Sequence, residues 1–234
     1  MTALLPAKGK GDMDLHGKRV AVTGANGALG RAVVDRARAL GAEVLQLDLA
    51  FGPEADTSCH AIDLADAEAT GACFGRLGRV DVLFNIAGGF TMGPQTWEVA
   101  DADWEQMFAI NVRTLQNAVR AVVPGMIAAG RGSIVNVGAL GALKGQPRMS
   151  AYTAAKSVVM RLTESLSAEL KDKGINVNAV LPSLIDTPRN RADMPGADYS
   201  RWLKPDDLAN VMCFLGSDAA RAVHGALVPV SALV

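Results

Sequence analysis

The alternation of short apolar runs with longer helical stretches is the feature that most constrains the fold of this 234-residue chain. Six runs rich in Val, Ile and Leu have the length and composition of buried parallel strands, and a shorter run at residues 59–63 is a candidate seventh. Together they cover residues 18–23, 42–48, 59–63, 80–86, 132–138, 175–181 and 226–230. Helical periodicity is found between them at residues 31–40, 66–77, 101–130, 151–173 and 204–218. The pattern predicts an α/β fold of the Rossmann type, in which helices cover both faces of a doubly wound, seven-stranded parallel sheet.

One folded domain is expected over residues 15–234, because the chain has no internal repeat, low-complexity segment or linker. Half of the residues are hydrophobic, which is enough for a sizeable core. Residues 1–14 lack the apolar centre of a secretion signal, and we expect them to form a flexible tail.

Charge and composition exclude several classes of function. A net charge of -1 without a long basic run argues against nucleic-acid binding. No apolar stretch approaches the roughly 20 residues of a membrane span. Three scattered cysteines suit reduced thiols in the cytoplasm, and three scattered histidines do not form a metal site. We therefore expect a cytoplasmic protein that acts on a small molecule, without a metal, a membrane or a nucleic acid as partner.

The loop TGANGALG, residues 23–30, separates the first predicted strand from the first predicted helix. Backbone N–H groups at such a helix start bind anions, and Gly24, Gly27 and Gly30 would let a pyrophosphate approach the main chain. Glycines also serve ordinary turns, but Asp48 closes the second strand where a carboxylate can bind ribose hydroxyls. That carboxylate repels a 2′-phosphate, and the loop contains no Lys or Arg to offset it. The predicted cofactor is NAD(H) rather than NADP(H).

Further motifs resemble the short-chain dehydrogenase/reductase family in their order and spacing. They are NIAGG at 85–89, Asn111 in its FAINV context, YTAAK at 152–156 and INVNAVLPSLIDTP at 175–188. The resemblance extends from about residue 18 to residue 230. It implies an enzyme that transfers hydride between NAD(H) and a small substrate.

The resemblance also implies roles for individual residues. Tyr152 would donate or accept a proton, Lys156 would be its partner and a ribose ligand, and Asn111 would hold a water of the proton relay. The implied cofactor-binding positions are Gly24, Asn26, Gly27, Ala28, Leu29, Gly30, Asp48, Asp63, Leu64, Asn85, Ala87, Gly88, Tyr152, Lys156, Pro182, Leu184, Ile185 and Thr187.

The chemistry of Tyr152 and Lys156 agrees with these roles. Residues four apart on one helix are neighbours on one face, and an ammonium beside a phenol favours the phenolate. Lowering the Tyr152 pKa by two or three units, each worth about 1.4 kcal/mol, would bring it into acid-base range near neutral pH. Such a pair usually marks a solvated helix face, but this one follows the fifth strand, at the edge where open sheets bind ligands.

Two positions depart from the family pattern. Ala28 occupies the place of the middle glycine of TGxxxGxG, and Gly27 stands one place early. Ala139 stands 13 residues before Tyr152, where the family has a catalytic serine. A carbonyl substrate would lose one of two donors to its developing oxyanion, typically about 10²–10³-fold in rate. Ser133 and Ser150 are the nearest hydroxyls, and neither is at the expected place.

Three segments also show local similarity to the dihydropteridine reductases of the same superfamily, in which an alanine replaces the serine. They are residues 85–90, 138–152 and 181–202. The similarity implies a flat, electron-poor substrate that accepts hydride without strong polarisation of a carbonyl. Residues 188–202 would form a lid, and the expected substrate surface comprises Ala139, Phe90, Met149, Met194 and Trp202, with Met92 and Tyr199 beside them. The alternative is that these residues only pack a surface loop.

Three functions remain open from the sequence: a reductase of a quinonoid dihydropteridine-like ring, an ordinary alcohol dehydrogenase or 3-oxoacyl reductase, and a non-catalytic NAD-binding protein. Helices at 103–129 and 151–173 carry apolar and small-residue stripes. The equivalent pair forms a four-helix contact in the resembling family, so we expect a homodimer or homotetramer. Packing against the sheet is the other explanation of the same stripes.

Overall fold

The structure, a computed structural model, describes residues 13–234. Residues 1–12 of the predicted tail lie outside the described residues. Met13 is partly buried and packs against the core, so the packed part of the chain includes this residue of the predicted tail.

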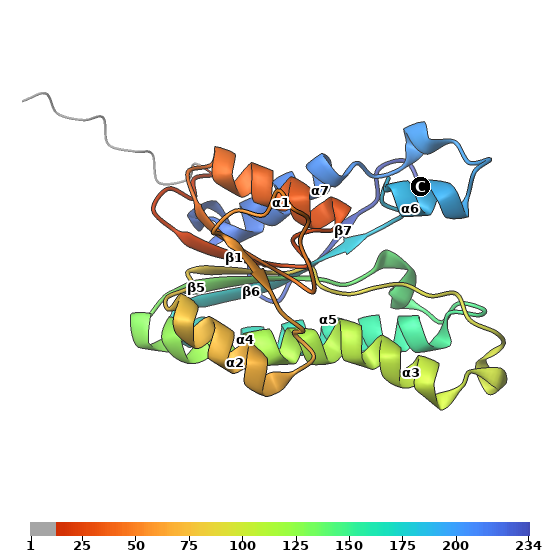
Figure 1. The fold of residues 1–234 in the computed structure, drawn as a ribbon, viewed down its shortest axis with the longest axis horizontal. Coiled ribbons are helices and arrows are strands. Elements are labelled where there is room, and N and C mark those ends of the chain that lie inside the picture. The colour runs from red at the N-terminus through yellow and green to blue at the C-terminus, as the bar shows by residue number, and fades with distance from the viewer. Residues whose placement is uncertain (1–12) are drawn as a thin grey trace, which may run out of the picture.

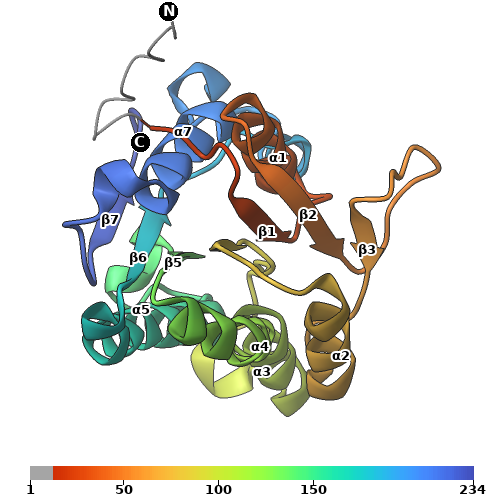
Figure 2. The same ribbon diagram turned by 90° about the vertical axis from the view of Figure 1, so that its left-hand side faces the viewer.

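A single seven-stranded sheet forms the centre of the molecule, and every pair of neighbouring strands is parallel. The strand order is β3-β2-β1-β4-β5-β6-β7, which Figure 2 shows from the side. The strands are β1 Arg19–Thr23, β2 Glu43–Asp48, β3 Cys59–Ala61, β4 Val82–Asn85, β5 Gly132–Val137, β6 Ile175–Pro182 and β7 Leu227–Val230. The predicted doubly wound Rossmann fold is confirmed.

Helices cover both faces of this sheet (Figure 1). The helices α1 (Ala28–Ala39) and α7 (Pro205–Gly216) pack together on one face. On the other face lie α2 Ala67–Leu77, α3 Asp101–Phe108, α4 Thr114–Ala129 and α5 Ser150–Leu170. Each face has its own apolar core, because the strands are buried on both sides.

The helical stretch predicted over 101–130 is divided by a π-helical turn at Ala109–Arg113. The side chain of Asn111, within this turn, donates a hydrogen bond to the carbonyl of Met107 at 3.0 Å. The predicted helix 151–173 ends as α5 at Leu170 and continues as a 3₁₀ turn over Lys171–Lys173. Apolar periodicity does not distinguish these turns from an α-helix, because the side chains keep nearly the same face.

The strand order reverses between β1 and β4, which are neighbours in the sheet although β2 and β3 separate them in sequence. The hydroxyl of Thr23, at the end of β1, accepts hydrogen bonds from the N–H groups of Ile86 and Ala87 at 3.0 and 3.1 Å. It thereby joins the glycine loop after β1 to the segment after β4. Open α/β sheets bind ligands at such a reversal, outside the carboxyl ends of the strands.

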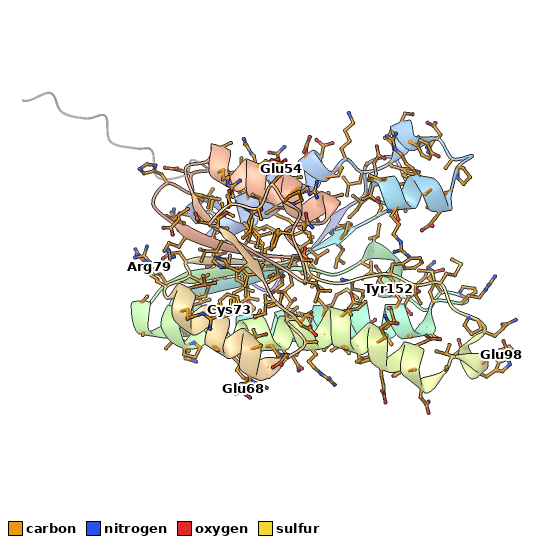
Figure 3. The ribbon with its side chains drawn as sticks, in the orientation of Figure 1. Glu54, Glu68, Cys73, Arg79, Glu98 and Tyr152 are labelled. Carbon is orange, nitrogen blue, oxygen red and sulfur yellow. The ribbon has the colours of Figure 1, made fainter. Side chains whose placement is uncertain are left out.

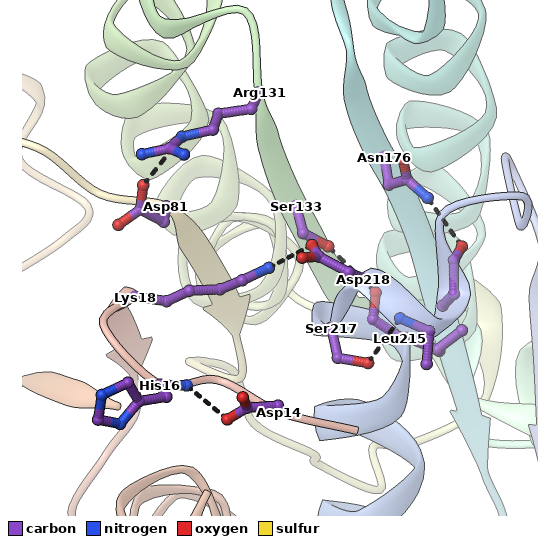
Figure 4. Close-up of polar contacts among 12 residues, drawn as sticks. Asp14, His16, Lys18, Asp81, Arg131, Ser133, Asn176, Leu215, Ser217 and Asp218 are labelled. Atoms are coloured by element: carbon purple, nitrogen blue, oxygen red, sulfur yellow. Dashed lines mark hydrogen bonds and ion pairs between the residues drawn. The ribbon is translucent and has the colours of Figure 1, made fainter. Parts of the chain in front are cut away.

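Polar contacts join neighbouring segments at the amino ends of the strands, opposite the carboxyl ends (Figure 4). Lys18 Nζ lies 2.6 Å from the Asp218 carboxylate, and Asp81 lies 3.8 Å from Arg131. The hydroxyl of Ser133 donates to the carbonyl of Leu215 at 3.1 Å. Ser133 therefore lies at the amino ends of the strands and cannot replace the missing serine of the site.

Three further observations concern the described residues. No helix within residues 13–234 is long and apolar enough to cross a membrane. Within the same range, no group of three or more His, Cys, Asp or Glu side chains is placed to hold a metal ion. Cys59, Cys73 and Cys213 are free thiols.

Candidate active site

The glycine loop packs too tightly against its neighbours for larger residues. Gly24 has φ +67°, and a Cβ there would lie 2.8 Å from the backbone nitrogen of Ala87. A Cβ on Gly30 would lie 2.0 Å from the carbonyl oxygen of Gly24. Gly27 has φ -72° and no atom nearer than 3.4 Å to such a Cβ, so it is less constrained.

The start of α1 in this loop fits the pyrophosphate of a dinucleotide. Gly27 is the N-cap residue and offers no side-chain hydrogen bond, and the first turn, which includes Ala28, Leu29 and Gly30, contains no acidic residue. The N–H groups at the helix start and the positive end of its dipole are therefore available to an anion. Leu29 itself points into the core and is 7% exposed, so its contribution would come from the backbone.

Asp48 is held at the edge of the glycine loop. Its carboxylate accepts hydrogen bonds from the N–H groups of Asn26 at 2.8 Å and Leu49 at 2.7 Å. Arg31, the first residue after the loop, donates to the Asn26 carbonyl at 2.9 Å and to its side-chain oxygen at 2.7 Å. The prediction that no basic residue serves this loop missed Arg31, which folds back onto it from α1.

Asp63 and Leu64, two of the predicted cofactor-binding positions, differ in their exposure. Asp63 is exposed, and its carboxylate accepts a hydrogen bond from the N–H of Ala65 at 2.9 Å. Leu64 is buried in the core and 4% exposed. Its carbonyl accepts from Asn117 at 2.9 Å. The side chain of Leu64 therefore does not form part of a cofactor surface.

Asn111, Gly88 and Lys156 come together from three separate elements. A Cβ on Gly88 would lie 2.6 Å from Asn111 Oδ1 and 3.4 Å from Lys156 Nζ. The Asn111 side chain also exchanges two hydrogen bonds with the backbone of Gly89, at 3.1 and 3.2 Å. Lys156 Nζ donates to the carbonyl of Val137, at the end of β5, at 2.8 Å. Because Gly88 has no side chain, the Asn111 side-chain oxygen and Lys156 Nζ can both lie close to its backbone.

Asn85 lies beneath the site, at the end of β4. Its amide donates to the side chain of Asn136 at 2.9 Å, and that residue donates to Thr163 at 2.9 Å. The side-chain oxygen of Asn85 is buried, and no residue between 13 and 234 forms a hydrogen bond with it. These contacts tie the segment containing Ala87 to β5 and α5.

Tyr152 lies at the carboxyl end of the sheet, and Figure 3 shows it far from Arg79 at the other end of the molecule. The ring of Phe90 meets the Tyr152 ring edge-on, with centroids 4.9 Å apart and planes at 87°. Tyr152 also packs against the cluster that contains Ala139 and Leu181. Ala139 is 5% exposed, so a methyl group fills the position of the expected serine within the cluster that Tyr152 contacts.

Burial shifts the pKa values of the two central groups in opposite directions. It raises the pKa of Tyr152 to about 12 and lowers that of Lys156 to about 8, in each case by disfavouring the charged form. The expected lowering of the Tyr152 pKa is thus contradicted, because desolvation of the phenolate dominates in this structure. At neutral pH Tyr152 is a phenol, and it is suited to donate a proton.

The lowered pKa of Lys156 makes stability depend on pH. Above pH 8 the unfolded chain, with a lysine pKa near 10.5, binds more protons than the folded chain, so this group adds stability as pH rises. We expect the wild type to gain up to about 1.4 kcal/mol per pH unit relative to Lys156→Met between pH 8 and 10. Urea unfolding gives the free energy of unfolding of both proteins at each pH, and the difference between them is the quantity compared. Burial raises the pKa of Cys213 to about 12, which has the opposite effect on stability, but both proteins contain this thiol and its effect cancels in the difference. Parallel pH profiles would contradict the expectation.

The segment predicted as a lid contains a short helix, α6 (Pro188–Asp193). The hydroxyl oxygen of Thr187 accepts from the N–H of Asn190 at 3.2 Å and so caps this helix. Arg191 binds both carboxylate oxygens of Asp186, at 2.5 and 2.7 Å. The lid is therefore fixed at its start.

The ends of the lid are joined to each other. Ile185 forms a β-bridge with Leu203, and Leu184 accepts a hydrogen bond from the N–H of Leu203 at 3.0 Å. Pro182, at the end of β6, is buried. These residues fix the base of the lid beside the sheet.

The predicted substrate surface is only partly available. Phe90, Met92 and Met194 are exposed, and Met149 is half-buried. Trp202, in contrast, is 5% exposed. It packs edge-on against Tyr199, with ring centroids 4.8 Å apart. The Trp202 ring therefore packs within the lid and presents little exposed surface, whereas a flat surface open to a substrate was predicted.

Two residues near the site were not predicted from sequence. Thr23 is the first residue of the glycine loop and the last of β1, and no role was predicted for its hydroxyl, which binds the N–H groups of Ile86 and Ala87. Arg148 adopts φ +60°, which is unusual for a residue with a side chain. Its position next to Met149, just before α5, was the only available signal.

The family assignment rests on the whole of this arrangement together with the sequence. The sequence model of the family described as short chain dehydrogenase matches residues 18–197, from before β1 into the lid. The chain is a short-chain dehydrogenase. It is accordingly an oxidoreductase, and the resemblance in sequence is confirmed.

Named relatives and solved structures agree with this membership. D-threitol dehydrogenase of Mycolicibacterium smegmatis is 33% identical over 92% of this chain and 92% of its own length. A candidate NAD(P)-dependent gluconate 5-dehydrogenase from Beutenbergia cavernae, with bound NADP, has a TM-score of 0.88 and 30% identity over 95% of this chain and 98% of its own. Carveol dehydrogenase of Mycobacterium avium, in complex with NAD, has a TM-score of 0.83 and 27% identity over 93% and 97%.

Proposed function

We propose that this short-chain dehydrogenase uses NADH to reduce a small, planar, electron-poor substrate, for which a quinonoid dihydropteridine is the chemical type. The observation that carries the proposal is Ala139, which puts a methyl group in the cluster packed against Tyr152. A carbonyl substrate that needs two hydrogen-bond donors to its developing oxyanion would find only one there. A conjugated ring that accepts hydride readily needs only the proton from Tyr152.

The chain's own residues can hold the cofactor and move the proton. The nicotinamide cofactor supplies hydride when it is bound between the glycine loop and the segment after β4. Tyr152 is protonated at neutral pH and serves as the proton donor. Lys156 and Asn111 lie together behind Gly88, where they would orient the cofactor ribose and a relay water. Phe90 would extend the aromatic surface beside Tyr152.

A second candidate is the oxidation of an alcohol in a polyol or sugar acid. The names of two similar proteins favour it, since one is a D-threitol dehydrogenase and the other a candidate gluconate 5-dehydrogenase. The missing hydroxyl at Ala139 opposes it. The test measures the change in NADH absorbance with a panel of quinones, pterins, ketones and polyols. Turnover of ketones or polyols alone would favour the second candidate, and no turnover would contradict both.

The proposed preference for NAD(H) depends on Asp48. We expect NADH to bind at least tenfold more tightly than NADPH, which corresponds to about 1.4 kcal/mol. Asp48→Ala should narrow this ratio, because it removes the repulsion of the 2′-phosphate. Fluorescence titration of both cofactors at moderate salt measures it. Arg31→Ala is the matched control, because it tests whether the guanidinium bound to Asn26 offsets the repulsion. Equal affinities in the wild type would contradict the assignment.

We also propose a homodimer or homotetramer in which α5 contributes to the contact. A groove beside α5 is lined by Trp104, Leu143 and Ala154, and the first two are 39% and 58% exposed. Light scattering should give at least twice the chain mass of 24.4 kDa at micromolar concentration. Ala154→Glu should reduce it to the mass of one chain, because the new carboxylate would be buried in the contact. A wild type that is monomeric would overturn the proposal.

A further inference from the structure

We infer that the site includes a subsite for a carboxylate of the substrate, formed beside Tyr152 by Arg148 and the start of α5. The inference deepens the proposed function and rests on it, because it concerns the same substrate. It adds that the planar substrate carries an acidic substituent close to the carbon that is reduced.

A recess next to Tyr152 contains the polar groups that define this subsite. Thr91, Asp103, Arg148 and Ser150 line it together with the Tyr152 ring. They come from three segments: the loop after β4, the first turn of α3, and the start of α5 with the residue pair before it. A ligand group in this recess would thus adjoin the proton donor.

Arg148 is held in place by its backbone and one nitrogen. Its φ of +60° is stabilised by a hydrogen bond from the N–H of Gly93 to the Arg148 carbonyl at 2.9 Å. Its Nε donates to the carbonyl of Gly93 at 3.2 Å. Within residues 13–234 the two terminal nitrogens of the guanidinium have no hydrogen-bond or ion-pair partner. Strained conformations of this kind are concentrated at ligand sites, and the unpaired nitrogens provide donors for one.

The start of α5 supplies further donors to the same recess. Met149, its N-cap residue, makes no side-chain cap, and the first turn of this 21-residue helix has no acidic residue. The hydroxyl oxygen of Ser150 is buried and has no hydrogen-bond partner among the described residues. Buried polar groups are nearly always paired, so this hydroxyl points to a missing acceptor or donor. Together with Arg148, it makes the recess favourable for an anion.

A carboxylate matches this set of donors best. Its two oxygens in one plane fit the fork of a guanidinium, and the exposed Arg148 side chain presents that fork at the edge of the recess. Asp103 lines the same recess, and in the described part of the chain it forms no ion pair with Arg148. It opposes an anion by charge repulsion, so its removal should strengthen binding.

The experiment is calorimetric titration of malonate, with malonamide as the neutral probe of similar shape. We expect malonate to bind more tightly than malonamide. Arg148→Gln should lower the affinity for malonate at least tenfold, and Asp103→Asn should raise that affinity several-fold. The opposite signs of the two variants keep the test valid if Arg148→Gln loosens the loop, because Asp103→Asn leaves the Gly93 contacts intact. Equal binding of both probes, or no change in either variant, would overturn the subsite.

Binding and turnover separate this inference from the proposed function. Reduction of a planar ring together with equal binding of malonate and malonamide would overturn the subsite and support the function. Malonate binding that depends on Arg148, in a protein that oxidises no NADH with any member of the panel, would support the subsite and contradict the function. Acidic and amidated forms of one ring substrate should then differ in KM, and Arg148→Gln should remove that difference.

Discussion

Tyr152→Phe is expected to lower kcat/KM for reduction of the substrate by NADH by about 10²–10⁴-fold, the range typical of a lost general acid. The phenol is the one acidic hydroxyl that packs against the Phe90 ring, and burial keeps it protonated at neutral pH. Phenylalanine keeps the ring and its packing but removes the proton. NADH oxidation by the purified variant, with the best substrate of the panel, measures the loss.

Cofactor binding serves as the control for this variant. NADH affinity should change little, because the ring packing remains and the hydrogen bond from Lys156 to the Val137 carbonyl does not involve the hydroxyl. A loss of turnover caused only by weaker NADH binding would show a different role for Tyr152. Retention of full activity would contradict the assignment of the proton donor.

Ala139→Ser is expected to raise the turnover of simple ketones by up to about 10²-fold, because it restores a second donor to the oxyanion. Reduction of an electron-poor ring should stay unchanged or fall, since a hydroxyl added at a position only 5% exposed must find its own partner. The comparison uses kcat/KM, so that equal changes in the binding of ground state and transition state are not counted as catalysis.

Ala142→Ser is the matched control, because Ala142 is buried in the same cluster at 3% exposure. It should leave ketone turnover unchanged. If the wild type already reduces ketones rapidly and Ala139→Ser has no effect, another group supplies the donor. The argument for an electron-poor substrate would then fail.

Local sequence was sufficient for the strands, the glycine loop and the family. All seven strands lie within one or two residues of their predicted bounds. For every strand except the short, partly exposed β3, the reason is that buried parallel strands are short continuous apolar runs between turns. Sequence also placed Tyr152 and Lys156 on one helix at the carboxyl edge of the sheet. These features depend on residues close together in the chain, or on the topology that their alternation dictates.

The tertiary structure decided what depends on contacts between distant segments. The π turn around Asn111 is fixed by bonds to Met107 and to Gly89, and the latter lies 22 residues away. Arg31 folds back on Asn26, Trp202 is buried at the end of the lid, and Tyr152 is desolvated by Phe90 and the cluster around Ala139. Sequence spacing predicts which residues share an element, but burial and partners depend on how elements pack. The sequence by itself therefore determined the fold and the family, whereas the packing of separate segments determined which side chains are exposed and the direction of the Tyr152 pKa shift.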